Sequence, residues 1–131
     1  MSKVENILRW IKISFGVITS VLTYLFGGAD MLLKALIFCI IADYITGIMS
    51  AVYLRKLNSH TGYKGILKKI AILVTVALGH IIGMLVGQES VREIVIGFYI
   101  ANEGISILEN VGRMDVKYLD KLKDILEQLK K

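Results

Sequence analysis

Long apolar stretches separated by short polar segments dominate the pattern along this chain. Four stretches stand out: Ile13–Ala29, Ala35–Leu54, Ile70–Gln88 and Ile94–Leu108. A membrane-spanning helix needs roughly 20 mostly apolar residues, and a span in lipid must satisfy its own backbone polar groups. The pattern therefore predicts an all-α integral membrane protein, a small bundle of about four transmembrane helices followed by a C-terminal amphipathic helix.

The same pattern predicts two regions. Residues 1–112 are expected to form a transmembrane helical domain, and residues 113–131 a cytoplasmic amphipathic helical tail. The expected spans cover about residues 8–28, 35–54, 68–88 and 92–110. The fourth is the shortest and most polar apolar stretch, because Asn102 and Glu103 interrupt it.

The first apolar stretch has a second interpretation. Residues 1–26 would form an amphipathic helix along the membrane interface, leaving three spans. Apolar residues recur there at helical spacing, and a tryptophan suits an interface: Val4, Ile7, Leu8, Trp10 and Ile11. A cleaved signal peptide is a third and less favoured interpretation. The sequence leaves three and four spans open.

The tail has the pattern of an amphipathic helix of the kind found in soluble proteins. Asp115 is the expected N-cap. The apolar positions recur every three or four residues: Val116, Leu119, Leu122, Leu126 and Leu129. Such a helix can lie on the membrane surface, dock on the bundle or pair with copies of itself.

Basic residues are distributed unevenly between the ends of the expected spans. Three lie in residues 1–12, one in 30–34, five in 55–69, one in 89–93 and six in the tail. Cytoplasmic segments carry the excess of Lys and Arg in membrane proteins. The alternation predicts four spans with both termini on the cytoplasmic side.

Two of the expected spans carry a polar face. In the second span the polar residues lie around Asp43, and in the fourth around Glu103. A carboxylate in a membrane span normally faces a bundle interior or a water-filled cavity. The candidate pore-lining or protomer-contact residues are Asp43, Thr46, Ser50, Asn102, Glu103, Ser106, Glu109 and Asn110. Two interpretations stay open: a private network within one bundle, or a surface shared between protomers. His80, in the third span, is a candidate partner for Glu103 or Asp43, or else a structural histidine.

The third span has a face of small residues, and the segment before it is basic. The small residues recur every fourth position and predict close helix packing, within the chain or between copies: Ala71, Thr75, Gly79, Gly83 and Gly87. The loop over residues 55–69 is expected at the membrane surface, with Ser59 or Thr61 capping the next helix. Its basic residues are Arg55, Lys56, Lys64, Lys68 and Lys69.

Composition narrows the function classes. Hydrophobic residues make up 55% of the chain, and the mean hydropathy is +0.64. The sequence has no recognisable catalytic constellation, nucleotide-binding motif or metal-ligand spacing, so we expect neither an enzyme nor a cofactor. The basic loop lacks a nucleic-acid-binding module, so we expect the lipid bilayer, not nucleic acid, as its partner.

Three motifs carry a resemblance to a known family. They are Asp43-x-x-Thr46-Gly47, then Gly65-x-x-Lys68-Lys69, and above all the run NEGISILEN from Asn102 to Asn110. From about residue 35 to its end the sequence resembles the holins of phage lysis and toxin secretion in Gram-positive bacteria, especially the clostridial type. Members usually carry proline between the NEGISILEN run and the tail, and this chain has none.

The resemblance implies a small protein of the bacterial cytoplasmic membrane that forms homo-oligomers. Such a protein opens lesions or pores at a set time, releasing endolysin or a large protein toxin without a required direct contact. Two alternatives remain at this point: a small proton-coupled multidrug or cation transporter, and an antiholin that regulates a partner holin.

Overall fold

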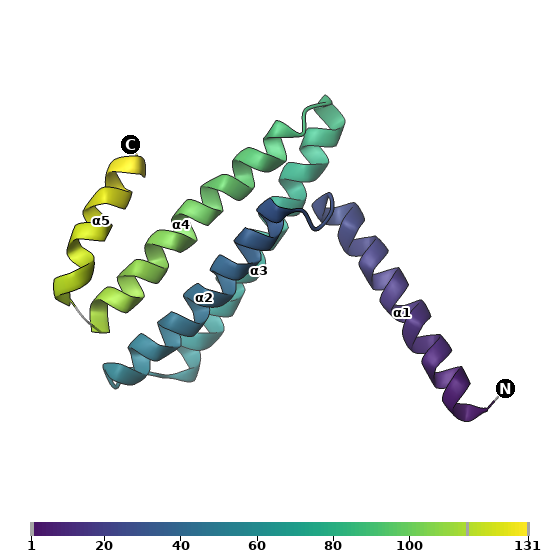
Figure 1. Cartoon of the computed structure of the whole chain (residues 1–131), viewed down its shortest axis with the longest axis horizontal. Coiled ribbons are helices and arrows are strands. Elements are labelled where there is room, and N and C mark those ends of the chain that lie inside the picture. The colour runs from purple at the N-terminus through teal and green to yellow at the C-terminus, as the bar shows by residue number, and fades with distance from the viewer. Residues whose placement is uncertain (1, 115, 131) are drawn as a thin grey trace.

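A computed structural model describes residues 2–114 and 116–130, and over these residues the chain forms five helices (Figure 1). In chain order they are α1 (Lys3–Phe26), α2 (Met31–Tyr53), α3 (Ser59–Val86), α4 (Ser90–Met114) and α5 (Val116–Lys130). The first four are long and apolar enough to cross a membrane. The predicted fold class is therefore confirmed: a helical membrane protein with four span-length helices and a short C-terminal helix.

Each of the first three helices starts at a side-chain cap. Ser2 and Glu5 form a capping box at the start of α1, and Asp30 caps α2 through the backbone N–H of Leu33. At α3 the cap is Asn58, whose Oδ1 accepts from the backbone N of Thr61 at 2.8 Å. The expectation that Ser59 or Thr61 would cap this helix is wrong. An Asn before the helix satisfies the free N–H groups of its first turn, so α3 starts earlier than predicted.

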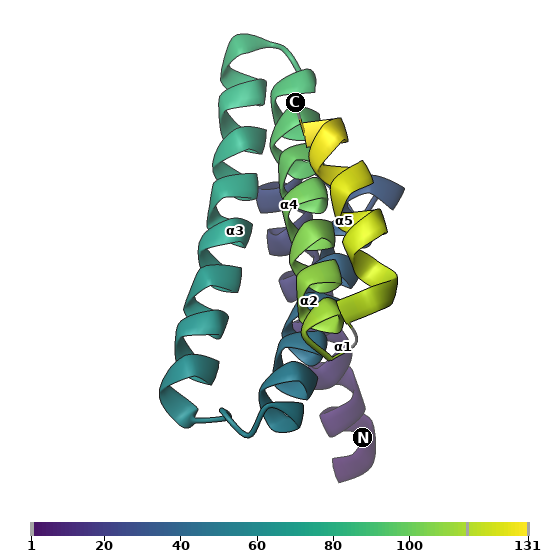
Figure 2. The same cartoon turned by 90° about the vertical axis from the view of Figure 1, so that its left-hand side faces the viewer.

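The central helix of the molecule is α4. It contacts α2, α3 and α5, whereas α2 and α3 touch each other far less. Figure 2 shows α3 and α5 on opposite sides of α4. A cluster of buried apolar side chains joins α2, α3 and α4: Leu33, Leu36, Ile40, Ile72, Val76 and Ile96.

Two glycines of the small-residue face bring α3 close to α4. A Cβ on Gly79 would lie 3.0 Å from a methyl group of Val95, and one on Gly83 would lie 2.7 Å from the backbone oxygen of Gln88. Gly87 has a different role, because it ends α3 in the left-handed conformation with φ 70°. Both contacts are made within the chain: Gly79 contacts α4, and Gly83 contacts the turn between α3 and α4.

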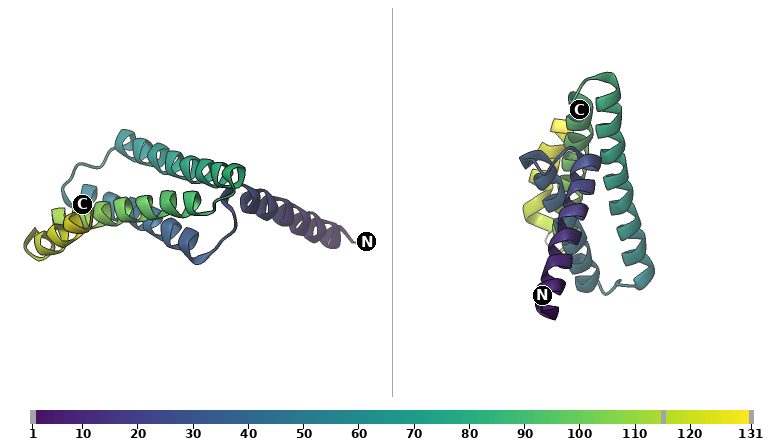
Figure 3. Two further views of the ribbon diagram at one scale, coloured as in Figure 1. Left: turned by 90° about the horizontal axis from the view of Figure 1, so that it is seen from above. Right: turned by 90° about the vertical axis from the view of Figure 1, so that its right-hand side faces the viewer.

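The first helix stands apart from the others. None of its residues is buried, although all of α1 is described. Among the described helices only α3 packs along it, and Arg92 of α4 donates a hydrogen bond to its last residue, Phe26. Figures 1 and 3 show α1 leaving the bundle near the α1–α2 turn, with the N-terminus far from the other helices.

The C-terminal helix folds back beside α4 (Figure 2). Lys123 Nζ on α5 lies 4.0 Å from Glu109 Oε1 on α4. Of the three arrangements open to the tail, the structure has the one docked on the bundle. Leu126 is half-buried and Leu129 exposed; Asp115, the predicted N-cap, lies outside the described residues.

Candidate functional site

A network of three charged side chains joins α2, α3 and α4 near the middle of the bundle. The ammonium group of Lys69 forms ion pairs with the carboxylates of Asp43 and Glu103. Asp43 is 8% exposed and Glu103 only 4%. Each group comes from a different helix, so the network ties the three helices together.

The lengths of the helices explain why these three residues meet. Lys69 follows Ser59, the first residue of α3, by ten positions, and Asp43 precedes Tyr53, the last of α2, by ten. Both therefore lie about 15 Å from the end of the bundle that holds the α2–α3 turn, at 1.5 Å per residue. Glu103 precedes the last residue of α4 by eleven positions, which places it at the same level.

An amide group completes the network on the side of the α2–α3 turn. The side-chain nitrogen of Asn110 donates to Asp43 Oδ1 at 2.8 Å, to the Asp43 carbonyl at 3.0 Å and to Thr46 Oγ1 at 3.0 Å. Arg113 donates in turn to Asn110 Oδ1 at 3.1 Å. Every buried side-chain polar atom among the described residues has a partner. Such pairing is what keeps buried polar groups from destabilising a fold.

A groove beside the network opens between α2 and α3, with α4 as its floor. Its volume is about 960 Å³, and it extends from Asp43 and Lys69 to the α2–α3 turn. In Figure 2 the two walls, α2 and α3, are joined by the short turn at the bottom of the view. The residues of α4 that line it are Tyr99, Asn102, Glu103, Ser106, Asn110 and Arg113.

The structure brings together most of the predicted polar residues. Six of the eight line the groove: Asp43, Ser50, Asn102, Glu103, Ser106 and Asn110.

 The seventh, Thr46, does not line the groove, but its hydroxyl accepts a hydrogen bond from Asn110, which does. The eighth, Glu109, lies outside the groove and faces Lys123 of α5. The two predicted polar faces therefore meet within one chain.

The basic residues predicted for a surface loop are divided between a turn and a helix. Arg55 and Lys56 lie in the α2–α3 turn, whereas Lys64, Lys68 and Lys69 belong to α3. Lys56, in the turn, and Lys68, which precedes Lys69 in α3, line the groove and are exposed. The sequence pattern missed the role of Lys69, because it is the last member of a basic run. Its position along the helix could have indicated this role, because Lys69 lies as far from the α2–α3 turn as the two carboxylates do.

His80 is not the partner of these carboxylates in the structure. It lies beside the α1–α2 turn, where a Cβ on Gly27 would approach its Nδ1 to 2.7 Å. The position expected for His80 next to Asp43 and Glu103 is taken by Lys69.

A second ion pair, also missed from the sequence, fixes the α1–α2 turn. Arg92 of α4 is 6% exposed and pairs with Asp30. Its Nη1 and Nη2 donate to the two Asp30 carboxylate oxygens at 2.8 and 3.1 Å, and its Nε donates to the carbonyl of Phe26 at 2.6 Å. The hydrogen bonds from Arg92, with that from the Leu33 amide, lower the pKa of Asp30 to about 2. The pair thus holds the end of α1 and the start of α2 against α4.

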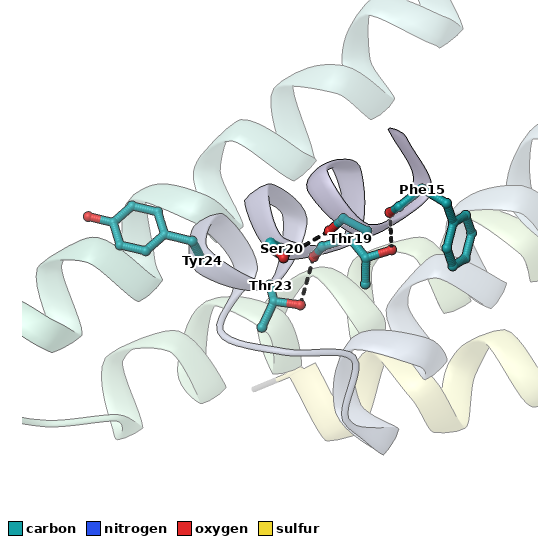
Figure 4. A pocket seen from close by; sticks show the side chains of 6 residues that line it. Phe15, Thr19, Ser20, Thr23 and Tyr24 are labelled. Carbon is teal, nitrogen blue, oxygen red and sulfur yellow. Dashed lines mark hydrogen bonds between the residues drawn. The ribbon is translucent and has the colours of Figure 1, made fainter. Parts of the chain in front are cut away.

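The hydroxyl groups of α1 behave differently from those of the bundle. A shallow hollow on α1 is lined by Phe15, Gly16, Thr19, Ser20, Thr23 and Tyr24 (Figure 4). Thr19, Ser20 and Thr23 each donate to the carbonyl four residues earlier, at 2.8 Å. Bonds of this kind satisfy hydroxyl donors within one helix, so these three hydroxyl groups need no partner from another helix.

Comparisons with known proteins point in one direction. A sequence profile of the bacteriophage holin family matches residues 20–131. An uncharacterized protein of Listeria monocytogenes is 47% identical over 123 residues, covering 93% of this chain and 86% of the relative. A protein of Bacillus phage phi105 that is named a probable holin is 35% identical over 95 residues, covering 72% of this chain and 70% of the relative. No solved structure matches the chain.

Proposed function

Because the chain belongs to the bacteriophage holin family, we propose that it acts as a holin. It oligomerises in the bacterial cytoplasmic membrane and forms lesions or pores there. These release endolysin or a large protein toxin, and so cause timed lysis or secretion. The observation that carries the proposal is the groove, in which charged and amide side chains lie at the middle of span-length helices.

The proposed topology has four spans and both termini on the cytoplasmic side. In Figure 1 the N-terminus, the α2–α3 turn and the end of α4 lie toward the lower side of the view. Toward the other side, Lys34 lies near the start of α2 and Arg92 near the start of α4, and Arg92 is neutralised by Asp30. This distribution supports the orientation, since the excess of unpaired basic residues marks the cytoplasmic side.

The network suggests how a folded protomer becomes part of a lesion. Two carboxylates share one ammonium group, so the ionised network carries one uncompensated negative charge in a part of the chain that crosses the membrane. Charges at that depth are costly in a dry bilayer and favour water. We propose that protomers associate with their grooves facing one another, which lets water reach the polar faces of α2 and α4.

A proton-coupled transporter, the alternative function, would require Glu103 to bind and release a proton. A proton-coupled transporter needs a carboxylate that alternates between a proton and its substrate, and here Glu103 is bonded to Lys69. An antiholin would share the fold and differ in its effect on a partner holin. Expression on its own separates a holin from the other two, because only a holin abolishes the membrane potential without a partner.

The test is inducible expression in bacterial cells that also produce a cytoplasmic endolysin. We expect an abrupt loss of membrane potential, followed by release of endolysin and lysis. Continued growth with a normal potential, while the protein accumulates in the membrane, would contradict the proposal.

The role of the polar faces has its own test in the same cells. Asp43→Leu and Glu103→Leu should each change the time of lysis, and Ile45→Leu, at an exposed position of α2, is the control. Lysis on the normal schedule in both charge variants would rule out these residues as pore or contact residues.

A further inference from the structure

The mouth of the groove, meaning its solvent-exposed rim, is basic. Lys56, Lys68 and Arg113 line it from the turn, α3 and α4 respectively. All three side chains are exposed. Deeper in the groove Lys69 is already paired with two carboxylates, so it adds no free positive charge to the mouth.

These three cations have no described counter-charge. Among the residues that the structure describes, no carboxylate lies within ion-pair distance of Lys56, Lys68 or Arg113. Arg113 makes one hydrogen bond, to Asn110, through Nη1. Three exposed basic groups around one cavity, without a described carboxylate, can bind an anion such as a phosphate group.

The walls of the groove are suited to an apolar chain attached to that anion. Ile48, Leu54 and Leu57 line it beside the basic residues. Glycine at positions 47, 62 and 65 leaves it wide, and Cβ atoms on Gly62 and Gly65 would meet only Tyr44. The outer sides of α2 and α3 are apolar and exposed, as at Ile45 and Ile70, which lets a lipid approach from the bilayer.

We propose that the groove binds an anionic glycerophospholipid, with its phosphate group held by Lys56, Lys68 and Arg113. The acyl chains lie against the apolar walls between α2 and α3. The charge complementarity of the mouth and its position beside apolar helix faces favour a lipid over a soluble phosphate. The lipid occupies the groove of a single protomer, before protomers associate through it, and the test of its binding does not depend on lysis.

The test is lipid binding to the purified full-length protein in an uncharged detergent, measured by native mass spectrometry. Phosphatidylglycerol is compared with phosphatidylcholine of the same acyl chains, and with soluble glycerol phosphate. The groove variant combines Lys56→Gln, Lys68→Gln and Arg113→Gln. The matched control combines Lys3→Gln, Arg9→Gln and Lys12→Gln, which removes the same charge from α1. Circular dichroism verifies that both variants remain helical.

We expect phosphatidylglycerol to bind more tightly than phosphatidylcholine, and its affinity to fall roughly tenfold to hundredfold in the groove variant. The control should change by less than about threefold. Binding of phosphatidylglycerol to the unaltered protein should also weaken as salt is raised, which tests the site without any substitution. Equal binding of the two lipids, or equal losses in the two variants, would overturn the proposal. Glycerol phosphate binding as tightly as the lipid would overturn the part that assigns a lipid.

Discussion

The helices α1 and α4 have nearly the same length and hydropathy but opposite surroundings. Each is long enough to cross a membrane, with mean hydropathy 1.3 for α1 and 1.2 for α4 over the most apolar window. No residue of α1 is buried, whereas α4 buries Arg92, Glu103 and Asn110 among others.

The difference lies in the chemistry of their polar residues. The hydroxyl groups of Thr19, Ser20 and Thr23 donate to backbone carbonyls of α1 itself, so they need no partner from another helix. The carboxylate, amide and guanidinium groups of α4 need partners from other elements, and they find them in α2, α3 and the α1–α2 turn. Hydropathy identifies span-length helices, but the type of polar group decides which of them occupies the centre of the bundle.

The largest effect is expected from removing the ammonium group of the network. Lys69→Met leaves two carboxylates facing each other without their cation, and should lower the free energy of unfolding by about 3–5 kcal/mol. Unfolding of the purified protein in mixed micelles, followed by circular dichroism, measures the change. Lys64→Met, at an exposed position of α3, is the control and should stay within about 0.5 kcal/mol. Equal changes in the two variants would refute the central role of the network.

A smaller effect is expected where the end of α3 contacts the α3–α4 turn. Gly83→Ala places a methyl group 2.7 Å from the backbone oxygen of Gln88, which cannot move aside easily. The expected loss is about 1–3 kcal/mol in the same unfolding measurement. Gly97→Ala is the matched control on α4, because no atom lies within 4 Å of its added methyl group. That variant should be neutral or gain up to about 1 kcal/mol from higher helix propensity.

The Asp30–Arg92 pair predicts a dependence of stability on pH. Hydrogen bonds from Arg92 lower the pKa of Asp30 from 3.8 to about 2 in the folded protein. The contribution of the pair is therefore complete above about pH 4 and is lost as the pH falls toward 2. The side chain of Asp30 is 51% exposed, so solvent screening limits the contribution to about 1 kcal/mol. Thermal unfolding between pH 5 and pH 2 should show this loss of stability in the unaltered protein. The Asp30→Asn variant should not show it.

The smallest effect separates the hydroxyl groups of α1 from those of the bundle. Thr19→Ala on α1 should change the free energy of unfolding by less than about 0.5 kcal/mol. Thr46→Ala in α2 removes the acceptor of a bond from Asn110 and should cost about 1 kcal/mol. If Thr19→Ala lowers the free energy of unfolding more than Thr46→Ala does, the Thr19 side chain has a structural partner outside α1.

Much of the fold could be predicted from the apolar pattern, because span-length helices are local features of a sequence. The four apolar helices and the resemblance to holins are both confirmed, and the family match extends the similarity from residue 35 back to residue 20. The helix starts could not be placed as well. Asn58 begins α3 before the apolar stretch does, so Lys64, Lys68 and Lys69 lie in a helix instead of a loop.

Of the network, only the carboxylate and amide side chains could be predicted from the sequence. Asp43, Glu103 and Asn110 can be recognised because they are polar residues in otherwise apolar stretches. Their partner Lys69 and the buried Arg92 belong to basic or turn segments, where sequence alone suggests contact with solvent or lipid. Which cation pairs with a buried carboxylate depends on the relative level of helices far apart in the chain, and that is a property of the packed structure.

The most direct test of this account is the time of lysis after induction for Glu103→Gln, compared with Glu93→Gln. Glutamine at position 103 retains an acceptor for Lys69 but removes the uncompensated negative charge of the network, whereas Glu93 is exposed on the same helix. At equal amounts of protein in the membrane, we predict a shifted onset of potential loss and lysis for Glu103→Gln and an unchanged onset for Glu93→Gln. An unchanged onset for Glu103→Gln would contradict the claim that the buried charge network controls opening of the membrane.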